Sequence, residues 1–202
     1  MPNALITGSG ARASDVAASL RCGGFEPLCA GSATKLVDVC ASVPPKSLDC
    51  YVQLPDDHAA RTTAVAEASA MVAERGLARY QAMATVAPLL TEAATVVLVM
   101  GDRMVDEPRP DLADAVDDLT RVLARALRDD YRATAVNVAL VGHEHSPSEI
   151  ASIARSGEGC PPPPPGASSG LAPDVAVSYV DFEPDLGFAE WRLEVLSLLE
   201  TT

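Results

Sequence analysis

Two histidines flank a carboxylate in the second half of the chain, in the triplet His143-Glu144-His145. Imidazole and carboxylate groups bind metals and carry protons near neutral pH, so the triplet is a candidate metal or acid–base site. Adjacent residues of an extended chain point in different directions, however, and such a triplet rarely supplies two ligands to one ion. The alternative, in which the sequence holds no metal site, is a polar loop that caps a helix beginning near Ser148.

Carboxylates also gather after an apolar run at 95–100, where Gly101-Asp102-Arg103 is followed by Asp106 and Glu107. Oxygen ligands of this kind suit a hard cation. The spacing of a calcium-binding loop is missing, and a solvated loop is the alternative reading of this segment.

Five cysteines could take part in covalent chemistry: Cys22, Cys29, Cys40, Cys50 and Cys160. Their odd number and the lack of a Cys-x-x-Cys motif favour free thiols in a reducing, cytoplasmic setting over a disulfide framework or a zinc site. Cys40 or Cys50 could act as a nucleophile with His58 as its base. A buried and inert thiol is the ordinary alternative.

Segments of strand and helix periodicity alternate along the chain, which predicts a single domain over 1–202 with a doubly wound, mostly parallel, Rossmann-like sheet and helices on both faces. In the amphipathic helix at 111–128, Asp114, Asp117 and Asp118 fall largely on the polar face, and Gly76 is a weak point of a long helix. The expected strands are 4–7, 25–30, 48–54, 95–100, 134–141 and 175–180. The expected helices are one that follows Gly10 and ends at Gly23-Gly24, then 32–41, 57–90, 111–128, 148–154 and 188–199.

A segment rich in proline, glycine and serine interrupts this alternation at about 156–173. It contains five consecutive prolines, Pro161 to Pro165, and is expected to be a loop of polyproline character. The alternative is a ligand for a groove of the SH3 type.

The formal net charge of -13 argues against nucleic acid and anionic membranes as partners, because both require a basic surface. No apolar stretch approaches the roughly 20 residues of a membrane span. The first residues, from Met1 to Gly10, lack the pattern of a secretory signal. A cytoplasmic protein is therefore expected.

Several segments, in this order, resemble the short-chain dehydrogenase/reductase family over about residues 1–142. Ala4-Leu-Ile-Thr-Gly-Ser-Gly resembles the family's first strand and turn, and Leu48-Asp-Cys-Tyr-Val resembles the strand before its Asn-Asn-Ala-Gly motif. Leu119-Thr-Arg-Val-Leu-Ala-Arg-Ala-Leu and the following Ala135-Val-Asn-Val-Ala-Leu-Val-Gly resemble a helix and the sixth strand. The interval between the second strand and the next is short, which suggests that one strand–helix unit is missing.

The resemblance implies that NAD(P) would bind at a turn whose family motif is Thr-Gly-x-x-x-Gly-x-Gly. Thr7 and Gly8 match this motif, and its later glycines fall on Arg12 and Ser14. Arg12 could contact a phosphate, or it could itself occupy the site. The candidate cofactor-binding residues are Gly8, Ser9, Gly10, Arg12 and Ser14.

The family's catalytic Tyr-x-x-x-Lys pair does not occur in the sequence, so no catalytic residue is predicted. The family's tyrosine and lysine fall at Arg109 and Ala113, its serine falls near Gly101, and its asparagine falls near Arg75. Arginine stays protonated and cannot exchange a proton during hydride transfer. The residues four positions after Tyr51, Tyr80, Tyr131 and Tyr179 are Pro55, Ala84, Ala135 and Glu183.

These features predict a non-catalytic module for binding, assembly or nucleotide sensing. The alternative is an NAD(P)-dependent oxidoreductase in which His143, His145 or Asp102 carries the proton. A third reading is a phosphorylated small molecule held by Arg12 and the helix terminus. By resemblance, helices 57–90 and 111–128 would pair between subunits of a homo-oligomer, or with an active relative.

Overall fold

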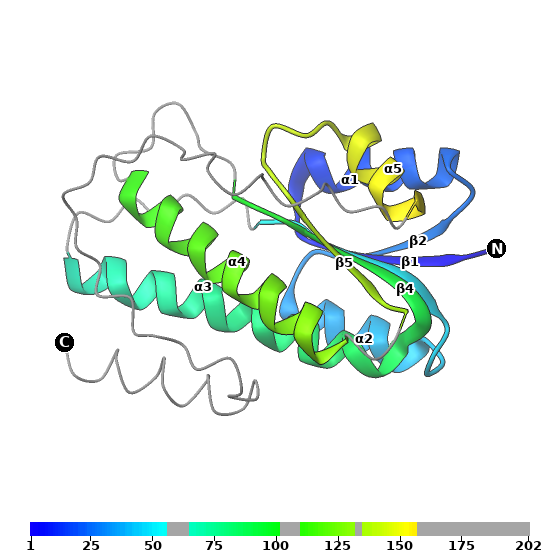
Figure 1. Ribbon diagram of the computed structural model, residues 1–202, viewed down its shortest axis with the longest axis horizontal. Coiled ribbons are helices and arrows are strands. Elements are labelled where there is room, and N and C mark those ends of the chain that lie inside the picture. Colours follow the sequence, from blue (N-terminus) through cyan, green and yellow to red (C-terminus); the bar gives the residue numbers. More distant parts are fainter. Residues whose placement is uncertain (56–64, 102–109, 132–134, 157–202) are drawn as a thin grey trace. The chain divides into compact units, whose positions relative to one another are not determined.

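The computed structural model describes residues 1–55, 65–101, 110–131 and 135–156, in which strands and helices alternate (Figure 1). The strands are β1 (Asn3–Thr7), β2 (Glu26–Ala30), β3 (Leu48–Gln53), β4 (Leu90–Val99) and β5 (Asn137–Val141). The helices are α1 (Gly10–Cys22), α2 (Ala33–Ser42), α3 (Val65–Val86), the 3-10 turn η1 (Ala87–Leu89), α4 (Pro110–Asp130) and α5 (Pro147–Ser156). The expected loop to 173, strand 175–180 and helix 188–199 lie outside the described residues.

The five described strands form one sheet in the order β2-β1-β3-β4-β5, and every neighbouring pair is parallel. The chain moves outward from β1 to β2 and then crosses back to β3 on the other side of β1. This order places a topological switch point between β1 and β3, where open α/β sheets bind their ligands at the carboxyl ends of the strands. The predicted doubly wound fold is confirmed.

Side chains alternate between the two faces of the sheet, and each face is covered by helices (Figure 1). Under α1 and α5, Ile6 and Val52 of the sheet share a buried cluster with Val16, Leu20 and Ile150 of these helices. The opposite face, whose fully buried side chains include Tyr51, lies toward α2, α3 and α4. Strands buried on both faces explain the continuous apolar runs of the sequence.

Most predicted elements are present, and within the described residues three boundaries differ from the expected ones by three residues or more. Helix α3 ends at Val86 rather than at 90, and Pro88 lies in the 3-10 turn that follows. Strand β4 begins at Leu90 because this residue already pairs with Leu48 of β3. Strand β5 begins at Asn137 rather than at 134. No helix in the described ranges is both long and apolar enough to cross a membrane.

Gly76 marks a close approach between α3 and α4, where the sequence suggested a weak point of the helix. Helix α3 continues through this residue without interruption. A Cβ atom at Gly76 would lie 2.7 Å from Cδ1 of Leu119 on α4. The glycine therefore gives room for the leucine of the neighbouring helix.

Replacing Gly76 by leucine is expected to lower the free energy of unfolding by about 1–3 kcal/mol, because the added carbons must displace Leu119. Gly76→Ala is the matched control: its methyl group meets only the flexible end of Leu119, while alanine gains up to about 1 kcal/mol of helix propensity. Urea unfolding followed by circular dichroism measures both variants. Equal stability of the leucine and alanine variants would contradict the close approach.

Candidate functional site

The turn between β1 and α1 lies at the switch point and depends on two glycines. Gly8 has a φ of 122° and Gly10 a φ of 82°, backbone conformations that residues other than glycine rarely adopt. A Cβ atom at Gly8 would lie 2.7 Å from Cβ of Leu54, so β3 passes directly against the turn. The Gly8 amide donates to the Ala30 carbonyl (3.3 Å) and the Leu54 amide to the Thr7 carbonyl (2.9 Å). These bonds join the carboxyl ends of β1, β2 and β3.

The N-terminus of α1 carries no side-chain cap, unlike the starts of α2 and α5. Ser9 at the N-cap position is extended and its side chain makes no capping hydrogen bond, and the first turn contains no acidic residue. By contrast, the Ser32 hydroxyl at the start of α2 accepts a hydrogen bond from the Lys35 amide. An uncapped helix start offers main-chain N–H groups and a positive dipole end to an anion.

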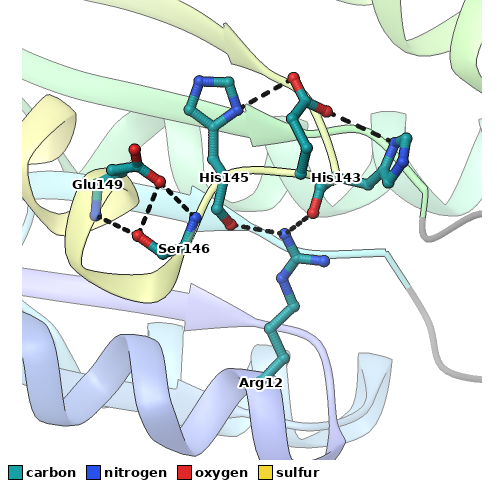
Figure 2. A network of polar contacts seen from close by, with 6 residues as sticks. Arg12, His143, His145, Ser146 and Glu149 are labelled. Atoms are coloured by element: carbon teal, nitrogen blue, oxygen red, sulfur yellow. Dashed lines mark hydrogen bonds and ion pairs between the residues drawn. The ribbon is translucent and has the colours of Figure 1, made fainter.

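Arg12 extends from the first turn of α1 toward the loop that follows β5 (Figure 2). Its Nη2 donates to the main-chain oxygens of His143 at 2.9 Å and His145 at 3.3 Å. The structure thus directs this side chain to the loop between β5 and α5, a placement that neither reading of the sequence included. Ser14 is exposed, and its hydroxyl donates to the Gly10 carbonyl at 3.5 Å within the helix.

The two histidines of the loop contact the same carboxylate from different sides. Nδ1 of His145 lies 3.3 Å from Glu144 and Nδ1 of His143 lies 3.7 Å from it, distances that form ion pairs when the imidazoles are protonated. Figure 2 shows the two rings pointing away from each other. Across the described ranges, no three His, Cys, Asp or Glu side chains gather as metal ligands would. The chain packs tightly here, since a Cβ atom at Gly142 would collide with the Glu144 carboxylate.

Ser146 and Glu149 form a capping box at the start of α5, with Pro147 as its first residue. Oε2 of Glu149 accepts from both the amide and the hydroxyl of Ser146 at 2.7 Å, and the Glu149 amide donates to the Ser146 hydroxyl at 3.3 Å. The side-chain and main-chain hydrogen bonds from Ser146 lower the pKa of the exposed Glu149 carboxyl. The prediction of a polar loop that caps a helix near Ser148 is confirmed.

A buried polar network, which the sequence analysis missed, crosses the carboxyl ends of β1, β3 and β4 on the α3 side. The Tyr51 hydroxyl lies 2.9 Å from the Thr7 hydroxyl and accepts from Gln53 Nε2 at 3.1 Å. Gln53 Nε2 also donates to the Arg79 carbonyl of α3 at 2.9 Å, and Arg79 Nη2 donates to the Val99 carbonyl at 2.9 Å. Sequence periodicity predicts a strand at 48–54, but it does not predict the hydrogen bonds of this strand with Thr7 and Arg79.

Burial makes Tyr51 and Cys50 poor acid–base or nucleophilic groups. Burial raises the pKa of Tyr51 to about 12, although hydrogen bonds with Thr7 and Gln53 act in the opposite direction. Burial, with a smaller effect of Asp49, raises the pKa of Cys50 to about 12, so its thiol stays protonated near neutral pH. Full burial of Cys50 therefore disfavours it as a nucleophile.

Within the described residues, the remaining cysteines are free thiols, as predicted. Cys22, Cys29 and Cys40 are free, as is Cys50, while Cys160 lies outside the described residues. Burial also raises the pKa of Cys40, which disfavours the thiolate that a nucleophile needs. Its suggested base, His58, lies outside the described residues.

Asp117 does not lie on the outer face of α4 as the sequence suggested. It is 3% exposed, and its Oδ1 accepts a hydrogen bond from the Gly101 amide at 2.7 Å. The carboxylate satisfies a main-chain N–H group just beyond the end of β4. The nearby candidates Asp102, Asp106, Glu107 and Arg109 lie outside the described residues.

The Glu149 cap predicts a pH-dependent contribution to stability. A carboxyl whose folded pKa is lowered stabilises the fold above its unfolded pKa, about 4.3, and loses this effect as the pH falls through the folded pKa. Glu149→Ala should therefore lower the melting temperature at pH 7, and the deficit should shrink below about pH 4.

Thermal unfolding of the original and variant chains from pH 7 to pH 3 measures this difference. Glu92→Ala, at an exposed glutamate 3.8 Å from Lys46, is the matched control, because surface ion pairs contribute little. A Glu149→Ala deficit that stays constant over this pH range would contradict the cap.

No protein-family model matches the chain, and no curated protein matches it. Solved structures do match over most of its length. A protein described as a short-chain alcohol dehydrogenase from Burkholderia multivorans has a TM-score of 0.63 at 11% identity, covering 79% of this chain and 93% of that one. A protein described as a short-chain dehydrogenase/reductase from Corynebacterium glutamicum has a TM-score of 0.54 at 18% identity, covering 76% of this chain and 90% of that one.

BdcA in complex with NADPH has a TM-score of 0.51 at 14% identity, covering 77% of this chain and 86% of that one. At such low identities the likeness concerns the fold and not the activity. Together with the parallel sheet and its strand order, these matches show that the chain has the Rossmann-like fold of the short-chain dehydrogenase/reductases.

Proposed function

We propose that the chain is a non-catalytic, short-chain dehydrogenase/reductase-like module that senses a nucleotide by binding its phosphates at Gly8, Ser9 and Gly10. The observation that carries this proposal is the uncapped N-terminus of α1 behind a glycine turn at the switch point of the sheet. Main-chain N–H groups at such a position bind phosphates in many α/β proteins. The NADPH in BdcA, a protein of the same fold, supports a nucleotide as the ligand class.

Hydride transfer is not part of this proposal, because the pair that exchanges the proton in the short-chain dehydrogenase/reductases is missing from the sequence. The sequence has no Tyr-x-x-x-Lys pair. Tyr51 lies at the carboxyl half of the sheet, but burial raises its pKa to about 12, far from the value near the working pH that suits a general acid–base. A binding role needs only the turn and the helix start.

The proposed site predicts that ADP binds, and that Ser9→Asp weakens this binding. An aspartate at the N-cap position satisfies the first N–H groups of α1 and repels phosphate, so the affinity for ADP should fall by about tenfold or more. The same substitution should not lower the melting temperature, because aspartate is a good N-cap residue. Calorimetric titration with ADP measures the affinity.

Ser32→Asp at the start of α2 is the matched control and should leave ADP binding unchanged. Failure of ADP and NADH to bind the original chain at millimolar concentration would rule out the proposed function. Turnover of NADH with a carbonyl substrate that is lost in His145→Ala would instead support the oxidoreductase alternative with a substituted proton carrier.

We further propose that copies of the chain pair through the outward face of α4. Asp118, Arg121 and Arg125 are exposed along this helix, and Asp118 forms an ion pair with Arg121 of the same copy. In an antiparallel pairing about a two-fold axis near Arg121, Asp118 of each copy lies opposite Arg125 of the other. Such a self-complementary arrangement is what a two-fold interface requires.

This pairing predicts that Arg125→Asp shifts the chain toward monomer at micromolar concentration, because the substitution brings two carboxylates together. The double variant Asp118→Arg/Arg125→Asp restores the opposite charges and should restore the dimer. Light scattering coupled to size-exclusion chromatography measures the mass. Arg155→Asp on α5 is the matched control, and a monomeric original chain would contradict the interface.

A further inference from the structure

Arg12 connects two parts of the carboxyl edge that are far apart in the sequence. Its guanidinium donates to His143 O at 2.9 Å and His145 O at 3.3 Å, across 131 and 133 positions of the chain. One end of this connection is the first turn of α1, beside the glycine turn. The other is the loop that leaves β5, at the opposite end of the sheet order from β2. We call these two hydrogen bonds the Arg12 strap.

The loop that accepts the strap leads directly into α5. The Glu144 side chain lies over Gly142, where a Cβ atom would meet its carboxylate. The capping box of Ser146 and Glu149 fixes the start of α5 directly after the loop. The two carbonyl oxygens accept from a charged guanidinium, and hydrogen bonds from a charged donor are stronger than those from a neutral one.

The strap lies where the second half of a dinucleotide would need to pass. A dinucleotide is bound across the switch point of a doubly wound sheet, with its pyrophosphate at the first helix start and its two nucleosides on opposite sides of it. In this sheet one side is formed by β2 and the other by β3, β4 and β5. Only the latter side is joined to α1 by the strap, as Figure 2 shows for Arg12 and the loop.

We propose that Arg12 determines the ligand class of the site: it admits a nucleoside diphosphate and excludes the nicotinamide half of a dinucleotide. This inference rests on the proposed function, since it assumes phosphate binding at the glycine turn. The diphosphate occupies the α1 start while the strap stays closed. A dinucleotide must break both hydrogen bonds of the strap, which lowers its affinity.

The test compares the affinities of ADP and NADH for the original chain and for Arg12→Ala, by calorimetric titration. ADP lacks the second ribose and the nicotinamide, so it reports on the first half of the site alone. We expect the original chain to prefer ADP by about tenfold or more, and Arg12→Ala to gain at least as much affinity for NADH. Arg21→Ala, at an exposed arginine in the last turn of the same helix, is the matched control and should keep the preference.

The outcomes separate the inference from the function on which it rests. Equal binding of ADP and NADH to the original chain, or a preference for ADP that survives in Arg12→Ala, overturns the role of Arg12 and leaves the proposed function standing. Absence of binding by both ligands, to the original chain and to the variant, removes the proposed function and the inference together. Thermal unfolding checks that the variant folds, and Arg12→Ser provides a second variant with a short side chain.

Discussion

The missing side chain at Gly8 is the constraint on which the carboxyl edge of the sheet depends. With a φ of 122° and only 2.7 Å available between a Cβ and Leu54, no other residue allows β1 to end against β3 in this way. This turn sets where α1 begins, and the start of α1 sets the direction in which Arg12 leaves the helix. The backbone conformation required at Gly8 therefore affects the hydrogen bonds that Arg12 makes with the loop after β5, at the far end of the sheet.

The same edge is fixed by polar contacts on both of its faces. On the α3 side, Tyr51 and Gln53 are buried and hydrogen-bonded to each other. Arg79 of α3 donates a hydrogen bond to the Val99 carbonyl at the end of β4. On the α1 and α5 side, the contacts are those of Arg12 with the loop after β5. Buried polar groups are usually hydrogen-bonded, and these contacts add directional constraints to the apolar packing of the edge.

The sequence predicted the elements well because strand and helix periodicity are local properties. The glycine turn, the end of α1 and the helix cap near Ser148 follow from residue types alone. Local periodicity does not predict tertiary contacts, and the Arg12 hydrogen bonds join positions 131 and 133 residues apart. Asp117 was misplaced because helical periodicity assigns charged residues to the solvent, whereas its burial is set by an amide at the end of a strand. The strand at 48–54 contains Tyr51 and Gln53, but the pattern could not show their partners, because Thr7 and Arg79 are distant in the sequence.

The hydrogen bond between Asp117 and Gly101 joins α4 to the sheet at its carboxyl edge. A buried carboxylate that lost this amide would be left desolvated without its partner, which is unfavourable. Displacement of α4 and displacement of the end of β4 are therefore energetically coupled. Thermodynamic linkage then makes this coupling reciprocal. A contact that stabilises one position of α4 changes the affinity for a ligand that prefers one position of the edge. Binding of that ligand stabilises the same position of α4 by the same free energy.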